Sequence, residues 1–180
     1  LGAARYLAET RNFAGTVHFI FQPGEEGGAG DKMMIDEGLF EKFPVEEVYG
    51  MHNMPGVPLG MFAGRPGPIM AAADMITITI KGRGGHAAYP HNTIDPVMVG
   101  AQIVNALQVI ASRNTDPLES IVVSITQFHA GTAQNIIPED AVLNGTVRTF
   151  TAELRVMAER RIREICAGIA AAHGATVDVL

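Results

Sequence analysis

The stretch MITITI, residues 75–80, alternates strictly between two kinds of side chain. Its three isoleucines fall on one face of an extended chain, whereas its methionine and two threonines fall on the other. Successive side chains of a β-strand point to opposite faces. The pattern therefore predicts a strand with one face buried against a core.

The segments after this strand follow a recognisable order. A Gly-rich turn leads to a predicted helix over residues 95–113, and strands are predicted over residues 120–128 and 141–150. A second helix is expected between a Thr151 cap and a Gly174 cap, and a last strand starts at residue 177. Residues 73–180 thus predict the ferredoxin-like β-α-β-β-α-β order, a four-stranded antiparallel sheet with two helices on one face. The expected core stripes of the two helices are Val99, Ile103, Leu107 and Ile110, then Leu154, Ala158, Ile162, Ile165 and Ile169.

The first part of the chain has a different texture. Helices are expected over residues 2–11 and 31–40, and strands over residues 16–22 and 47–52, which together indicate an α/β layer. Residues 53–70 are rich in Pro and Gly, as domain boundaries often are, so the predicted domains are residues 1–70 and 71–180. The chain begins inside an apparent helix and ends in a short strand, and we expect it to be an internal piece of a longer polypeptide.

Composition narrows the class of protein. Of 180 residues, 47% are hydrophobic and 18% charged, which is typical of a globular chain with a sizeable core. The net charge of −6 argues against nucleic acid and anionic membrane as partners. The single cysteine, Cys166, lies in a helical pattern and is predicted to be a small buried hydrophobe. A reducing cytoplasm is the expected compartment.

Two adjacent carboxylates follow the first predicted strand in HFIFQPGEEGG, residues 18–28. Glu25 and Glu26 repel each other unless a cation or a proton compensates. A divalent ion could be held by one carboxylate while the other activates a water, and His52 could reach the same crevice from the next strand. The alternative is a solvated loop with two surface glutamates and a histidine that only packs.

The sequence motifs around these residues are a more specific signal than the two carboxylates themselves. GTVHFIFQPGEEGGAGDKMMIDEGLF and VYGMHNMPGVPLG resemble the amidohydrolase branch of the aminoacylase/carboxypeptidase metallopeptidases, which includes hippurate hydrolases. ITIKGRGGHAAYPHNTIDPV and AGTAQNIIPEDAVLNGTVRTF resemble the lid, or dimerisation, domain of the same family. The resemblance implies a zinc-peptidase α/β domain, only part of which is present here, followed by a ferredoxin-like lid.

The resemblance also implies roles for six residues. Glu25 would be the general base, and Glu26 and His52 would be metal ligands of a dinuclear site, usually zinc, although manganese, cobalt or nickel also suit such ligands. The family's other metal ligands have no counterpart in this sequence. His86, Asn135 and Arg148 would contact the substrate, with His86 acting across a dimer in many members. From the residues alone, these three could equally be a hairpin histidine, a turn asparagine and an arginine on an exposed strand face.

The resemblance thus implies a metal-dependent hydrolase that cleaves the amide bond of N-acyl amino acids or small peptides. With an incomplete metal site, this chain by itself is expected to be inactive. A homodimer through the lid domain is expected, with no nucleic-acid or membrane partner. The alternative is a non-catalytic dimerisation or ligand-binding module.

Overall fold

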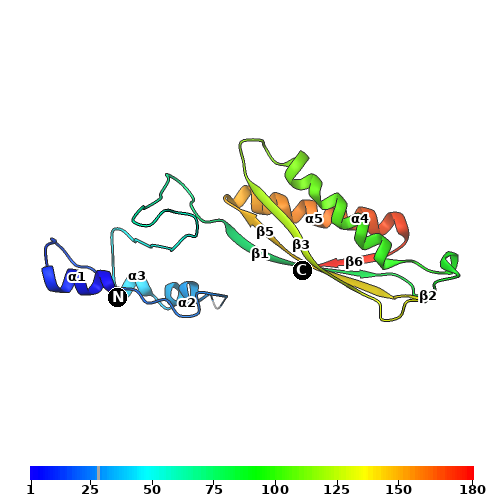
Figure 1. The fold of residues 1–180 in the computed structure, drawn as a ribbon, viewed down its shortest axis with the longest axis horizontal. Helices are drawn as coiled ribbons and strands as arrows, with labels where there is room; N and C mark the ends of the chain where they lie inside the picture. The colour runs from blue at the N-terminus through cyan, green and yellow to red at the C-terminus, as the bar shows by residue number, and fades with distance from the viewer. Residues whose placement is uncertain (28) are drawn as a thin grey trace. The chain divides into compact units, whose positions relative to one another are not determined.

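The computed structural model describes residues 1–27 and 29–180, which form two compact units, Leu1–Gly60 and Met61–Leu180. The first unit contains helices α1 (Gly2–Thr10), α2 (Gly30–Asp36) and α3 (Leu39–Lys42), coloured blue to cyan in Figure 1. The second contains the sheet and the long helices. Among the described residues, no helix combines the length and apolar character that a membrane span requires.

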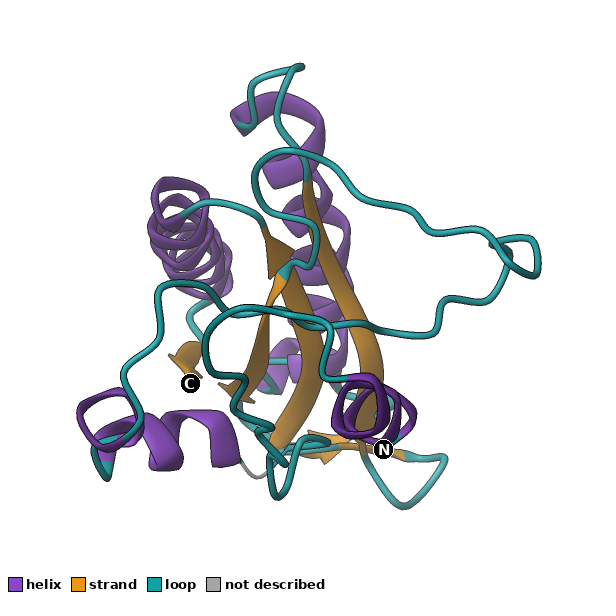
Figure 2. Cartoon of the chain, turned by 90° about the vertical axis from the view of Figure 1, so that its left-hand side faces the viewer, coloured by secondary structure: helices purple, strands orange, loops and turns teal. Residues whose placement is uncertain are grey.

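The second unit has the predicted β-α-β-β-α-β order. Its main sheet is antiparallel with strand order β3-β5-β1-β6, and its strands lie side by side in Figure 2. The strands are β1 (Ala72–Lys81), β3 (Ile121–Ala130), β5 (Asp140–Thr149) and β6 (Thr176–Val179). Helices α4 (Pro96–Val109) and α5 (Ala152–His173) cover one face of this sheet, and a π-helical turn, Ile110–Asn114, extends α4. A separate two-stranded sheet joins β2 (Gly85–His86) to β4 (Ile136–Ile137), and a 3-10 turn, Pro90–Asn92, follows β2.

Burial follows the alternation that the sequence predicted. Ile76, Ile78 and Ile80 of β1 are buried beneath the helices, and Ile78 pairs with the fully buried Leu143 of β5. All four predicted core residues of the first long helix are buried, three in α4 and Ile110 in the π-helical turn that extends it. On α5, Cys166 and Ala170 are buried, whereas the predicted Ile165 and Ile169 pack only partly against the core. Burying one Val, Leu or Ile side chain contributes about 1.5–3 kcal/mol to the free energy of unfolding. The second unit therefore has a substantial core.

Side-chain caps fix where both long helices begin. The Asp95 carboxylate accepts hydrogen bonds from the amides of Val97 and Met98, at 2.9 and 3.4 Å. The Thr151 hydroxyl accepts from the Leu154 amide at 3.3 Å, as its predicted capping role requires. Gly174 ends α5 at a φ of 71°, a left-handed conformation that favours glycine. The predicted caps of α5 are confirmed.

A β-bulge in β3 changes which side chains face away from the helices. The register shifts between Ile125 and Gln127, so Thr126 is the extra residue. Before the bulge the odd-numbered side chains face the helices, and after it Phe128 does so, close to Gly100 of α4. Gln127 and His129 consequently lie on the open face of the sheet, because the side-chain period of a strand is two.

The two strands predicted in the first unit are absent, and these predictions were wrong. Residues 16–22 and 47–52 have no paired strand among the described residues, and their apolar side chains, such as Phe21 and Tyr49, are exposed. A strand is stabilised by a hydrogen-bonded neighbour, which an apolar run of strand-forming residues alone does not supply. The helix predicted over residues 31–40 is divided at Gly38, whose φ is 85°.

Candidate active-site residues

The adjacent carboxylates lie in a tight loop that precedes α2. Gly24 has a φ of 60°, and the Glu25 carbonyl accepts a hydrogen bond from the Gly27 amide at 3.0 Å. The loop then packs against itself at Gly30, where a Cβ would lie 1.7 Å from the Pro23 carbonyl oxygen. Both carboxylates are exposed, so the loop leaves them accessible to a ligand.

His52 makes a hydrogen bond that determines which of its ring nitrogens can accept a proton or bind a metal ion. Its Nδ1 lies 2.6 Å from the backbone carbonyl oxygen of Asn53, and a carbonyl can only accept. Nδ1 therefore carries the hydrogen in the neutral ring, which leaves the lone pair of Nε2 exposed. Metal-binding histidines commonly have this arrangement, with the second nitrogen donating to a carbonyl or carboxylate.

The metal site predicted from Glu26 and His52 is not complete within the described residues. A carboxylate and a neutral imidazole are suitable ligands for a divalent ion. However, residues 1–27 and 29–180 contain no group of three or more His, Cys, Asp or Glu side chains placed to hold a metal. The structure thus provides suitable ligand types in the first unit but not a full coordination sphere.

His86 and Asn135 lie next to each other although they are far apart in sequence. Strands β2 and β4 pair His86 with Ile136, and the Ala87 amide donates to the Asn135 carbonyl at 2.9 Å. Both side chains are exposed. His86 also accepts a hydrogen bond at Nδ1 from the Ala88 amide at 3.1 Å.

Arg148 lies at the opposite end of the same unit. It is on β5 between Ala73 of β1 and Val122 of β3, and its exposed side chain belongs to the face without helices. The β2–β4 pair adjoins the Asp140 end of β5, since the Gly82 amide donates a hydrogen bond to the Glu139 carbonyl oxygen there at 2.8 Å. Arg148 lies eight residues after Asp140 along the strand, roughly 26 Å away at a rise of about 3.3 Å per residue. A single copy of this unit does not bring Arg148 together with His86 and Asn135.

A polar network on the open face was not predicted. Thr77 donates to Asn144 Oδ1 at 2.9 Å, Asn144 Nδ2 donates to Gln127 Oε1 at 3.0 Å, and His129 Nε2 lies 3.4 Å from that same oxygen. The sequence shows these residues as polar members of alternating strands. Their alignment depends on the bulge in β3, which has no local sequence signal.

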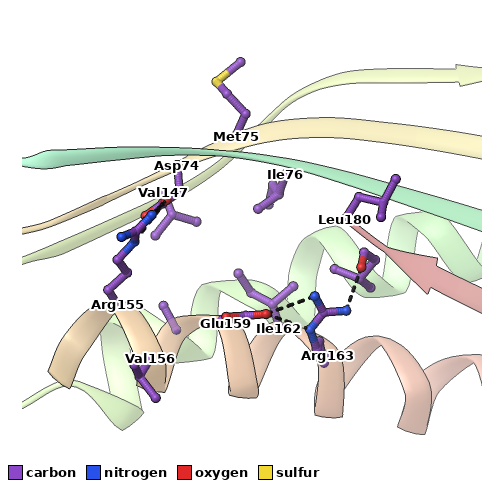
Figure 3. A pocket seen from close by; sticks show the side chains of 12 residues that line it. Asp74, Met75, Ile76, Val147, Arg155, Val156, Glu159, Ile162, Arg163 and Leu180 are labelled. Carbon is purple, nitrogen blue, oxygen red and sulfur yellow. Dashed lines mark hydrogen bonds and ion pairs between the residues drawn. The ribbon is translucent and has the colours of Figure 1, made fainter. Parts of the chain in front are cut away.

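A cavity of the second unit is lined by none of the predicted site residues. It has a volume of about 340 Å³ and lies between the sheet and α5, with Ile76 and Val147 lining it from the sheet and Ile162 from the helix (Figure 3). Its charged groups are paired: Arg155 binds Asp74, and Arg163 binds Glu159 and the Val179 carbonyl oxygen. The charged side chains of this cavity are therefore already engaged in ion pairs with one another.

Cys166 is neither a ligand nor a nucleophile in this structure. It is a fully buried free thiol, and burial raises its pKa to about 11. A protonated thiol inside the core neither binds metal nor attacks a substrate. The prediction that Cys166 is a buried hydrophobe is confirmed.

Comparison with known proteins identifies the family. Residues 72–173, the segment from β1 to the end of α5, match the peptidase dimerisation domain of M20 peptidases. The chain belongs to the M20 peptidase family. The resemblance inferred from the sequence, including the lid or dimerisation domain, is confirmed.

This M20 chain is similar to proteins of known activity along nearly its whole length. It is 44% identical to an N-acetylcysteine deacetylase of Bacillus subtilis, over 99% of this chain and 47% of that protein. It is 45% identical to a hippurate hydrolase of Campylobacter jejuni, over 98% of this chain and 46% of that protein. The M20 chain therefore spans less than half the length of these relatives.

Solved structures confirm the mixed α/β fold of the M20 chain. A dinuclear metal binding peptidase of the M20 family from Bacillus subtilis superposes with a TM-score of 0.76 and 38% identity. The match covers 99% of this chain and 44% of the other. A putative aminohydrolase from methicillin-resistant Staphylococcus aureus matches 64% of this chain, with a TM-score of 0.62 and 29% identity.

Proposed function

We propose that this chain is part of a metal-dependent hydrolase that cleaves the amide bond of N-acyl amino acids or small peptides. The observation that carries the proposal is the similarity of almost the entire chain to a deacetylase of N-acetylcysteine and to a hippurate hydrolase. The compound in each of these enzyme names, N-acetylcysteine or hippurate, is an amino acid acylated on its nitrogen. In this proposal residues 1–70 belong to the catalytic domain and residues 71–180 form the lid, in a cytoplasmic enzyme.

The proposed chemistry assigns one task to each candidate residue. Glu26 and His52 would hold a divalent ion, which would lower the pKa of a bound water and polarise the scissile carbonyl. Glu25 accepts the proton of the attacking water and later delivers it to the leaving nitrogen. The free Nε2 of His52 supports its assignment as a ligand. His86 and Asn135 of one copy hold substrate oxygens, and Arg148 of a second copy pairs with the substrate carboxylate, because a single copy does not bring these residues together.

The complete polypeptide provides the test of this function. We expect it to contain a divalent metal and to hydrolyse N-acetyl or N-benzoyl amino acids, and we expect the 180-residue chain alone to do neither efficiently. Metal analysis and a screen of N-acyl amino acids should be run on both proteins in parallel. A metal-loaded complete polypeptide that releases no amino acid from any of these compounds would disprove the proposed activity.

We propose further that the partner is a second copy of the chain, added along β3. The β3 strand spans 10 residues at one edge of the sheet and exposes 46% of Val122. An exposed, long edge strand readily pairs with another strand.

Sedimentation equilibrium on the 180-residue chain tests this dimer. Val122→Glu would place two like charges near the shared edge, and we expect it to raise the dimer dissociation constant about tenfold, or about 1.4 kcal/mol. Val156→Glu is the matched control, because Val156 is 67% exposed on α5, away from β3. Equal effects of the two variants, or a wild-type chain that stays monomeric at high concentration, would contradict pairing along β3.

A further inference from the structure

We infer that the backbone amide of Ala88 holds His86 in the tautomer whose hydrogen is on Nε2, so that His86 acts as a hydrogen-bond donor to a substrate oxygen. Ala88 is then a positioning residue that acts through its backbone. The tautomer follows from the structure of the second unit alone, whereas the substrate oxygen rests on the proposed hydrolase function. The inference also excludes His86 from two other tasks, binding a metal and accepting a proton at Nε2.

The hydrogen bond between Ala88 and His86 is what determines the tautomer. The Ala88 amide nitrogen lies 3.1 Å from His86 Nδ1. A backbone N–H can only donate, so Nδ1 must be the accepting nitrogen and cannot carry a hydrogen. In a neutral imidazole the single hydrogen is then on Nε2. Nε2 consequently has no lone pair for a metal ion or a proton.

His52 shows the opposite arrangement in the same chain. Its Nδ1 lies 2.6 Å from a backbone carbonyl oxygen and must donate, which leaves Nε2 as the acceptor. The two exposed histidines thus present different atoms to a ligand: a lone pair on His52 and an N–H on His86. This difference matches a metal ligand at the first position and an oxygen-binding donor at the second.

Close contacts hold the backbone around His86, and they therefore fix the point from which the imidazole extends. The His86 carbonyl accepts from the Tyr89 amide at 2.8 Å, closing a turn. A Cβ at Gly84 would lie 2.8 Å from the Ile137 carbonyl oxygen, and one at Gly85 would lie 2.8 Å from Thr93 Cγ2. Without side chains at these two positions, the turn packs directly onto β4 and onto the segment before α4. The Tyr89 ring lies beside the imidazole, with 5.7 Å between the ring centroids and a tilt of 58°.

A donor fixed in this way favours a carbonyl or carboxylate oxygen as its ligand. Preorganised donors stabilise negative charge that develops on an oxygen, because they need no reorientation during the reaction. Asn135, beside His86 through the bond from the Ala87 amide to its carbonyl, has a side-chain amide that can donate to the same ligand. Acyl groups and amino-acid carboxylates both supply such oxygens.

Nuclear magnetic resonance of the ¹⁵N-labelled 180-residue chain at neutral pH tests the tautomer directly. Long-range ¹H–¹⁵N correlations report which ring nitrogen is protonated, and the His86 signals are those lost in His86→Gln. We expect two widely separated nitrogen shifts, with Nε2 protonated, and a scalar coupling across the Ala88 N–H···Nδ1 bond. His91 serves as internal reference, since its ring nitrogens make no hydrogen bond within residues 1–27 and 29–180. Protonation at Nδ1, or His86 shifts averaged like those of His91, would overturn the inference.

Substitution at position 88 separates the amide from the side chain. Ala88→Pro removes the N–H and is expected to abolish the coupling and reduce the separation of the two nitrogen shifts to that of His91. Ala88→Ser keeps the N–H and is expected to retain both. If Ala88→Pro does not fold, the wild-type spectrum still decides, because the coupling is measured there. The proposed hydrolase activity could fail its own test without changing these spectra, so the two outcomes remain distinguishable.

Discussion

Glu25→Gln in the complete polypeptide is expected to lower the turnover of an N-acyl amino acid at least roughly 100-fold, the contribution typical of a general base. Glutamine has nearly the same shape but cannot accept the proton of the attacking water. The metal content is expected to be unchanged, because the proposed ligand is the neighbouring Glu26. The measurements are kcat on an N-acyl amino acid and metal analysis of the same sample.

Two further substitutions make this result specific to Glu25. Glu37→Gln removes an exposed carboxylate at the end of α2 and should retain activity. Glu26→Gln should lose metal as well as activity. Retained turnover in Glu25→Gln would remove Glu25 from the mechanism, and a parallel loss of metal would make Glu25 a ligand instead of a base.

The second large effect concerns the core of the sheet. Leu143 is fully buried on the central strand β5, paired with Ile78 on one side and Phe128 on the other. Leu143→Ala is expected to lower the free energy of unfolding of the Met61–Leu180 unit by about 3 kcal/mol, since it removes apolar burial and leaves a cavity. Urea unfolding of the 180-residue chain, followed by circular dichroism, measures this change.

Leu118→Ala is the matched control for that measurement. The chemical change is the same, but Leu118 is 96% exposed between α4 and β3. Its effect should stay within about 0.5 kcal/mol, as for most surface substitutions. Equal losses of stability at the two positions would contradict the burial of Leu143 in the core.

The family was predictable from the sequence motifs, whereas the spatial arrangement of the candidate residues was not. The motifs around Glu25, His52 and His86 pointed to a metallopeptidase, and the family assignment agrees with them. The roles of the individual residues remain proposals. That His86 adjoins Asn135, and that Arg148 lies at the other end of β5, depends on strand pairing between residues distant in sequence. No local pattern specifies such pairing.

The sequence alone determined the order of strands and helices in residues 73–180, because side-chain periodicity and helix caps are local properties. The isoleucines of MITITI, the stripe of α4 and the caps Thr151 and Gly174 all act within a few residues. The tertiary structure decided the strand order β3-β5-β1-β6, the bulge in β3 and the hydrogen bond from the Ala88 amide to His86 Nδ1, since each requires contacts between separate segments or a defined turn. Residues 16–22 and 47–52 also show that a strand requires a partner segment: they have the composition of strands but no hydrogen-bonded neighbour among the described residues.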